Sequence, residues 1–135
     1  MKTKVYFNNS CSICRTEINQ YKKHSGDKID WVDISSSLDA EKETNIKTDD
    51  LYRRMHVLEN GKLISGAKSF LIIWGEIPKY KFLKKIFEKP LIFPLFNIIY
   101  EAVAYLLYLK SKISRWKYYR RIYRFQKKLF LIIKL

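Results

Sequence analysis

The first part of the chain shows two kinds of hydrophobic pattern in succession. Residues 4–7 form a short β-branched and aromatic run, and residues 29–34 alternate between apolar and polar, so each predicts a strand. Between them, apolar side chains at helical spacing predict a helix over residues 12–24. Asn8-Asn9-Ser10 predicts the turn that leads into this helix, because these residue types favour turns and helix N-caps.

The following segment predicts a hairpin and another helix. A polar stretch with a short helix or loop around residues 38–43 comes first. Residues 55–58 and 63–65 then flank Asn60-Gly61, a dipeptide that favours a two-residue hairpin turn. Apolar side chains on one face predict a helix over residues 66–74. A parallel crossover plus an antiparallel hairpin gives an α/β fold class, an α+β mixed sheet covered by helices.

The rest of the chain predicts helices only. Pro90 and Pro94 break the pattern and are expected to frame a turn. Residues 95–109 are apolar nearly all round, as in a helix packed inside a protein. Asn97 and Glu101 interrupt the surrounding apolar stretch, which favours a buried helix over a membrane span.

Charge divides the chain into two unequal parts. Residues 1–78 hold 12 Lys+Arg and 11 Asp+Glu, whereas residues 79–135 hold 15 and 2, so nearly all of the net charge of +14 lies in the second part. The last segment, residues 115–134, predicts a strongly amphipathic helix. Its apolar stripe is Tyr118, Ile122, Phe125, Leu129 and Ile133, and its basic stripe is Lys117, Arg120, Arg121, Arg124, Lys127 and Lys128.

This basic helix has three interpretations. It could lie on an anionic membrane with its aromatic residues inserted, bind nucleic acid through phosphates, or pack on its own domain with its charges solvated. The apolar end of the chain, Phe130-Leu131-Ile132-Ile133, suits a phosphate contact poorly, so nucleic acid is the less favoured partner.

The chemistry-bearing feature is the segment Cys11-Ser12-Ile13-Cys14, which holds both cysteines of the chain. A disulfide between them would close a very small loop and add little stability, so chemistry explains the pair better than stapling. Near a βαβ pattern this spacing is typical of a redox dithiol. Cys11 falls at the helix N-terminus, where free N–H groups favour a nucleophilic thiolate. Cys14, one turn later, is placed to resolve the mixed disulfide.

Three alternatives remain beside the redox interpretation. The cysteines could be half of a zinc site, but His24 and His56 are the only histidines and neither has ligand spacing to the pair. They could be buried apolar residues, or relics in a catalytically idle fold. Thiol exchange needs no metal and no organic cofactor, so neither is expected.

The chain resembles the DCC family of thiol-disulfide oxidoreductases, whose signature is Asp-x-x-Cys-x-x-Cys. Here the signature region reads Phe7-Asn8-Asn9-Ser10-Cys11-Ser12-Ile13-Cys14. Further matching segments within residues 3–110 are Trp31-Val32-Asp33-Ile34, Arg54-Met55-His56-Val57, Gly61, Gly66-Ala67, Phe70, Pro94-Leu95-Phe96 and Tyr100. The resemblance implies a thioredoxin-like fold and a redox role.

The chain departs from this pattern in two ways. Asn8 replaces the signature Asp, which removes a carboxylate that could take a proton from the resolving cysteine. Asn9 replaces a Gly, and Asn tolerates the left-handed conformation that such a turn can need. Thioredoxins also place a cis-proline before the strand that faces the dithiol, and no proline precedes residues 55–58 here.

Two further side chains invite roles. His56 could shuttle protons to the dithiol or be a structural residue of its strand. Asp33 is expected to be a strand-end or turn carboxylate.

These observations predict a thioredoxin-like domain over residues 1–110 and a basic amphipathic helical tail over residues 111–135. Asn8 and Asn9 end the first apolar run too early for a secretory signal, so a cytoplasmic location is expected. The expected function is a thiol-disulfide oxidoreductase, with Cys11 attacking and Cys14 resolving a protein or small-molecule disulfide. The alternative is a redox-inactive thioredoxin-like binding module that uses its tail to attach to an anionic membrane or a partner.

Overall fold

A four-stranded mixed sheet lies at the centre of the molecule. The computed structural model describes residues 2–133, with side chains for residues 2–128, 130 and 131. The strands are β1 (Thr3–Phe7), β2 (Ile29–Asp33), β3 (His56–Glu59) and β4 (Lys62–Ser65). In the order β2-β1-β3-β4, β1 pairs parallel with β2 and antiparallel with β3, and β3 pairs antiparallel with β4.

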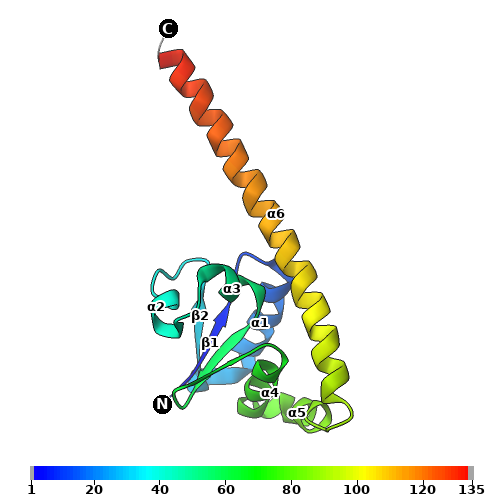
Figure 1. Ribbon diagram of the computed structural model, residues 1–135. Coiled ribbons are helices and arrows are strands. Elements are labelled where there is room, and N and C mark those ends of the chain that lie inside the picture. Colours follow the sequence, from blue (N-terminus) through cyan, green and yellow to red (C-terminus); the bar gives the residue numbers. More distant parts are fainter. Residues whose placement is uncertain (1, 134–135) are drawn as a thin grey trace.

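Six helices and two short 3₁₀ turns connect and cover the strands. They are α1 (Ser12–Ser25), η1 (Gly26–Lys28), α2 (Ala40–Thr44), α3 (Thr48–Arg53), α4 (Ala67–Glu76), η2 (Pro78–Tyr80), α5 (Lys81–Phe87) and α6 (Phe93–Ile133). The β1-α1-β2 crossover followed by the β3-β4 hairpin and α4 is a thioredoxin-like arrangement, so the predicted fold class is confirmed (Figure 1). The predicted short helix near residues 38–43 is α2, and α3 follows it.

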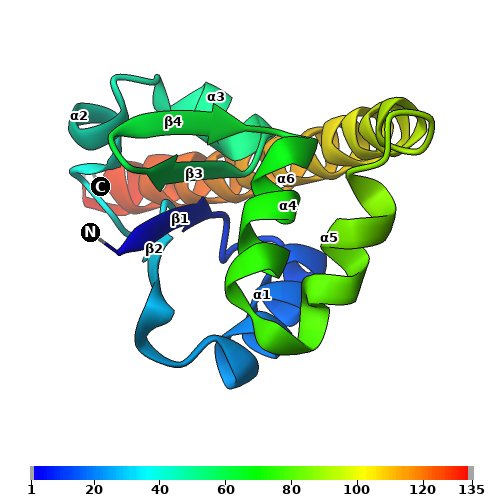
Figure 2. The same cartoon turned by 90° about the horizontal axis from the view of Figure 1, so that it is seen from below.

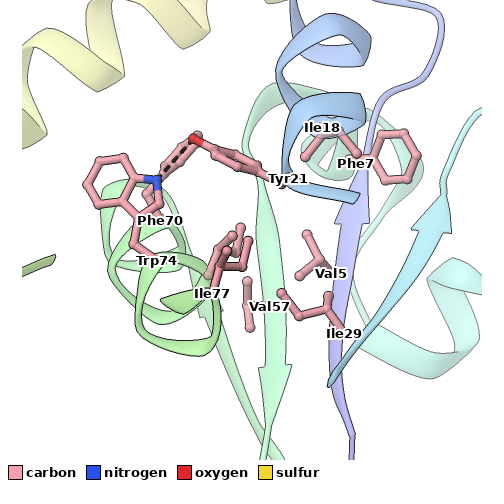
Figure 3. Close-up of a cluster of buried hydrophobic side chains, with 10 residues drawn as sticks. Val5, Phe7, Ile18, Tyr21, Ile29, Val57, Phe70, Trp74 and Ile77 are labelled. Carbon is pink, nitrogen blue, oxygen red and sulfur yellow. Dashed lines mark hydrogen bonds between the residues drawn. The ribbon is translucent and has the colours of Figure 1, made fainter. Parts of the chain in front are cut away.

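The two faces of the sheet carry separate cores. On one face, helices α1 and α4 pack over β1 and β3, as Figures 2 and 3 show. This larger core consists of Val5, Phe7, Ile18, Tyr21, Ile29, Val57, Phe70, Ile73, Trp74 and Ile77. On the other face, α2 and α3 cover a smaller core of Tyr6, Ile34, Ala40 and Leu51. Alternation along β1 sends Val5 and Phe7 to one core and Tyr6 to the other, as a period of two requires.

The predicted hairpin turn is confirmed. Asn60 and Gly61 have φ values of 49° and 74°, the pair of left-handed residues that a tight hairpin turn needs. Gly66, which precedes α4, has φ 77° and ψ −148°, a conformation almost restricted to glycine. A Cβ atom added there would lie 3.4 Å from the carboxylate of Glu101 and 3.6 Å from the ring of Tyr100, both on α6.

The C-terminal helix differs from the prediction in two respects. Residues 93–133 form one continuous helix, and Pro94 lies in its first turn, where a missing N–H costs nothing. The expectation of a helix buried over residues 95–109 is wrong, since Leu95, Ile98 and Leu106 are 61%, 66% and 64% exposed. The helix packs on α3 and α4, with Phe96 and Tyr100 against the larger core. Within residues 2–133, no helix is long and apolar enough to cross a membrane.

The distal part of α6 extends away from the domain (Figure 1). Every side chain from Trp116 to Lys128 is exposed. The interpretation that this segment packs on its own domain is therefore wrong. The predicted stripe members Leu129 and Ile133, and residues 134–135, lie outside the described side chains.

We expect Gly66→Ala to destabilise the fold by roughly 1–3 kcal/mol, because alanine must adopt a conformation that is almost restricted to glycine. Gly61→Ala is the matched control. It has a positive φ but open space around its Cβ position, so its cost is smaller. The measurement is the free energy of unfolding in urea for both variants. Equal costs would show that neither the backbone conformation of Gly66 nor the contact of its Cβ position with α6 adds to the cost of a positive φ.

Candidate active site

Cys11 lies in the connection between β1 and α1, directly before the helix. It is the N-cap residue of the helix, with φ −82° and ψ 117°. Its Sγ accepts a hydrogen bond from the backbone N–H of Cys14, 3.4 Å away. The first turn of α1 holds no acidic residue. Negative charge on the Cys11 sulfur is therefore stabilised by free backbone N–H groups and by the helix dipole.

The two sulfur atoms are close and unequal. Both cysteines are free thiols and partly exposed, and the Cys14 Sγ donates to the Cys11 Sγ over 2.7 Å. Burial raises the pKa of the Cys14 thiol, and the hydrogen bond to Cys11 and the negative charges of Cys11 and Glu17 raise it further. At neutral pH Cys14 therefore stays a thiol that can donate its hydrogen to Cys11.

Asn8 organises the turn before the dithiol. Its buried side-chain Oδ1 accepts hydrogen bonds from the Ser10 backbone N–H at 3.0 Å and from the Ser10 hydroxyl at 2.5 Å. The Cys11 N–H donates to the Asn8 carbonyl oxygen at 3.4 Å. This Asx-type turn sets where Cys11 stands at the end of α1.

Asp33, at the end of β2, holds the same turn from the neighbouring strand, so it is the strand-end carboxylate that was predicted. Its Oδ1 accepts from the Asn9 N–H at 3.3 Å, from the Ser35 N–H at 2.9 Å and from the Ser35 hydroxyl at 2.6 Å. The Ser36 hydroxyl donates to the other oxygen, Oδ2. Partial burial opposes ionisation, but these hydrogen bonds from Ser35, Asn9 and Ser36 together hold the pKa of Asp33 below its usual value.

An apolar cavity of about 280 Å³ adjoins the dithiol. Both cysteines, Asn8 and Glu17 line it, together with side chains from three other parts of the fold. The apolar part of the wall includes Phe7, Met55, Phe70, Trp74, Phe96 and Tyr100. A disulfide with an apolar substituent would find a matching surface here.

A second hollow, of about 440 Å³, also adjoins Cys11. Its walls include the Ser10–Ile13 segment and Lys110, Ser111, Ser114 and Arg115 of α6. Cys11 lines both hollows, whereas Cys14 lines only the first.

Helix α6 forms one wall of both hollows and is fastened to the α3–β3 segment. The Arg54 guanidinium donates through two nitrogens to Glu101 Oε2, at 2.9 and 3.1 Å. The Tyr108 hydroxyl donates to Asp49 at 2.6 Å, and the Arg115 guanidinium lies 4.0 Å from the ring centroid of Tyr52. These contacts lie on both sides of the dithiol along the helix and hold the wall in place.

Comparison with known proteins assigns this arrangement to a family. The model of DCC1-like thiol-disulfide oxidoreductases matches residues 5–113. The chain belongs to this family. The match includes the dithiol, all of the sheet except the first two residues of β1, α4, and the half of α6 that lines the cavity. No curated protein and no solved structure matches the chain.

The DCC1-like chain forms a hydrogen-bonded turn before the dithiol although Asn8 replaces the signature acid. Asn9 was expected to tolerate a left-handed conformation, but among the described residues only Asn45 and Asn60 combine a positive φ with a side chain. The turn therefore rests on the side-chain acceptor of Asn8 and on Asp33, rather than on left-handed backbone.

Met55 occupies the position before β3 that faces the dithiol, and no peptide bond of the described chain is cis. Its N–H donates to the Tyr100 hydroxyl at 3.0 Å, and its carbonyl oxygen accepts from the Gly66 N–H at 2.9 Å and the Ser69 hydroxyl at 3.2 Å. Both backbone groups are thus occupied within the chain. A substrate strand cannot pair with them as long as Tyr100 stays in place.

The structure does not bring His56 to the dithiol. His56 is buried on β3 next to Val57, whose side chain lies in the core on the α1 face, so the His56 side chain points to the opposite face. Its Nδ1 is 2.8 Å from the Arg54 carbonyl oxygen, and burial lowers its pKa. His56 is absent from the cavity lining. Across residues 2–133, no group of three or more His, Cys, Asp or Glu could hold a metal ion.

The predicted site residues therefore separate into two groups. Asn8, Asn9, Ser10, Cys11, Ser12, Ile13 and Cys14 are brought together at the start of α1. Lys117, Arg120, Arg121, Arg124, Lys127 and Lys128 lie on the exposed part of α6 beyond the cavity. Sequence reasoning missed Glu17 and Tyr100 as cavity residues, and helical spacing of Glu17 from Cys14 was the one signal available for the former.

We expect Asp33→Asn to lower the thermal stability of the protein at neutral pH. The folded-state pKa of Asp33 is lowered, so its contribution is complete above the unfolded-state pKa and is lost as the pH falls through the folded-state pKa. The difference in Tm between wild type and variant should therefore shrink on acidification. The effect is modest because the carboxylate is largely solvated. A difference that stayed constant from neutral to acid pH would contradict this account, and Ser35→Ala should reproduce part of it.

Proposed function

We propose that this chain is a thiol-disulfide oxidoreductase in which Cys11 is the attacking thiolate and Cys14 the resolving thiol. The observation that carries the proposal is the unequal setting of the two sulfurs. Cys11 is at the end of a helix dipole and open to two hollows, whereas Cys14 is held as a thiol at the cavity wall. Membership of the DCC1-like family supports the reaction class.

The reduction of a disulfide R–S–S–R′ proceeds in two exchanges. The Cys11 thiolate attacks one sulfur, forms a Cys11–S–S–R bond and expels R′S⁻. The Cys14 sulfur then attacks the Cys11 sulfur, forms the Cys11–Cys14 disulfide and expels RS⁻, while its own proton leaves. The dithiol is oxidised by two electrons and the substrate is reduced by two, so no metal or organic cofactor is required.

Substrate recognition is expected to use side groups. The backbone of Met55 is occupied by Tyr100, Gly66 and Ser69, so strand pairing contributes nothing in this conformation. The apolar cavity beside Cys11 can instead hold an apolar group attached to the disulfide. The substrate is therefore a small-molecule or protein disulfide whose substituent enters this cavity.

We expect Cys11 to be alkylated by iodoacetamide at least about tenfold faster than Cys14 at neutral pH, because alkylation requires the thiolate. The measurement is the rate at each cysteine against pH, by mass spectrometry of the reduced protein. Cys14→Ser should retain the fast reaction and accumulate a mixed disulfide with substrate.

Cys11→Ser is the matched variant, and it should lose both the fast alkylation and disulfide reduction. If both cysteines of the wild type reacted slowly, the oxidoreductase proposal would be wrong. The chain would then be a redox-inactive thioredoxin-like binding module.

A second proposal concerns the tail, and we infer that it attaches the protein to an anionic membrane surface. Six cations lie along one side of the exposed helix, and residues 110–128 contain no acidic side chain. Trp116, Tyr118, Tyr119, Tyr123 and Phe125 are 58–69% exposed in the same segment. Membrane binding of such a helix is favourable, because its aromatic side inserts into the lipid while its cations contact lipid phosphates.

A lipid surface fits the tail better than nucleic acid. Phosphate contacts with nucleic acid would use the cations but would leave Phe130 and Leu131, 61% and 56% exposed, in water. In this proposal residues 1–110 form the catalytic domain and residues 111–135 the attachment segment of a cytoplasmic, peripheral protein. The division falls within α6, which runs through it without a break.

We expect the full chain to float with vesicles that contain phosphatidylserine and to stay behind with purely zwitterionic vesicles. Changing Arg120, Arg121 and Arg124 together to Glu should abolish flotation, because each cation near the surface contributes about 1 kcal/mol. The matched control changes Lys23, Lys28 and Lys68 to Glu. This variant changes the net charge by the same amount as the Arg variant, but on exposed side chains outside the tail.

Equal loss in both triple variants would show that only net charge matters. Unchanged flotation of the Arg variant, or binding of duplex DNA in preference to vesicles, would exclude the membrane proposal.

A further inference from the structure

Glu17 is an acidic side chain that the two-exchange scheme leaves unused. It lies on α1 one turn after Cys14, so the two side chains are on the same helix face. It is half-buried and lines the apolar cavity with both cysteines. An isolated carboxylate is costly in an apolar wall, so its presence calls for a partner or a task.

A chain of hydrogen bonds fixes the Glu17 carboxyl group. Trp74 Nε1 on α4 donates to the Tyr21 hydroxyl at 3.0 Å (Figure 3), and this hydroxyl donates to Glu17 Oε1 at 2.7 Å. Tyr21 is buried, and its pKa is raised by burial first and by Glu17 second, so the phenol stays protonated. One carboxyl oxygen is thus anchored, which leaves the second oxygen to meet another donor.

The acidities of Glu17 and Cys14 are shifted in the same direction by their shared surroundings. Burial raises the pKa of Glu17, and the hydrogen bond from Tyr21 only partly offsets this. The negative charge of Glu17 is one of the causes that raise the pKa of Cys14. A carboxylate with a raised pKa is a stronger base, and the charge coupling shows that the two groups sense one another.

We propose that Glu17 is the proton acceptor for Cys14 in the resolving step, a role that Asn8, in the place of the signature acid, cannot fill. This inference rests on the proposed oxidoreductase function. In the mixed disulfide, the Cys14 S–H bond breaks and its proton passes to Glu17 Oε2, directly or through one water. The electron pair of the broken S–H bond forms the Cys14–Cys11 S–S bond. The electron pair of the S–S bond between Cys11 and R leaves with RS⁻. Solvent later takes the proton from Glu17.

Other titratable groups around the cavity are accounted for. Tyr21 already donates to Glu17, and Arg54 is paired with Glu101. The Tyr100 hydroxyl accepts from the Met55 N–H, and burial raises its pKa to about 12, so it does not compete as a base at neutral pH. The remaining groups of the lining are Tyr52, Arg53 and Tyr108.

The two exchanges can be followed separately with one reagent. Dithiobis(nitrobenzoate) releases one coloured thiolate when Cys11 attacks and a second when Cys14 resolves. In single-turnover stopped flow of the full chain, Glu17→Gln should slow the second release on the order of 10²-fold near neutral pH and leave the first unchanged. Glu17→Asp should recover part of the rate. Glu88→Gln, which changes an exposed glutamate away from the cavity, should alter neither phase.

The pH profile separates a proton acceptor from a merely structural residue. In the wild type the rate of the second release should fall as the pH drops through the pKa of Glu17, and this limb should vanish in Glu17→Gln. Tyr21→Phe removes the hydrogen bond that lowers this pKa, so it should move the limb to higher pH.

The outcomes distinguish an error in the proposed oxidoreductase function from an error in the role of Glu17. No first release in the wild type would overturn the oxidoreductase function itself. A normal first release with an unchanged second release in Glu17→Gln would overturn only the role of Glu17. A slower second release in His56→Ala together with an unchanged one in Glu17→Gln would likewise show that our inference is wrong.

Discussion

The structure around the dithiol depends on the free backbone N–H groups at the start of α1. They have no partner inside the helix, so the chain must supply one, and Cys11 supplies its sulfur. That position is fixed from both sides, by the Asn8 turn and by Asp33 on the next strand. Everything else at the site, including the cavity and α6, is arranged around a sulfur whose place is set by the end of a helix.

The sequence predicted well what depends on local chemistry. The strand, the Asn-rich turn and the cysteine at the helix start are consecutive residues, and the Asn60-Gly61 turn needs only its own two residues. The Cys11–Cys14 pair was found in the same way. The Glu17 site escaped prediction because its partners Tyr21 and Trp74 meet across 53 residues of chain, and a glutamate on an amphipathic helix resembles a solvent-facing one.

The error over residues 95–109 has a different origin. An apolar stretch shows that a helix avoids water, but not how many neighbours are present to cover it. Here Phe96 and Tyr100 pack against the domain, while Leu95, Ile98 and Leu106 face outward. Pro94 was expected to frame a turn, but it lies in the first turn of α6. A proline there and a proline that ends a helix cannot be distinguished until the start of the helix is known.

Helix α6 contributes to the cavity wall and to the tail as one element. Its 41 residues span about 60 Å at the rise of an α-helix. It has no proline or glycine beyond its first turn to act as a hinge. Along this rod the contacts of Arg115 with Tyr52 and of Tyr108 with Asp49 lie nearest the exposed part, and the Arg54–Glu101 and Tyr100–Met55 contacts follow further from it. A group bound to the exposed part of α6 is therefore joined to the cavity wall by one uninterrupted helix.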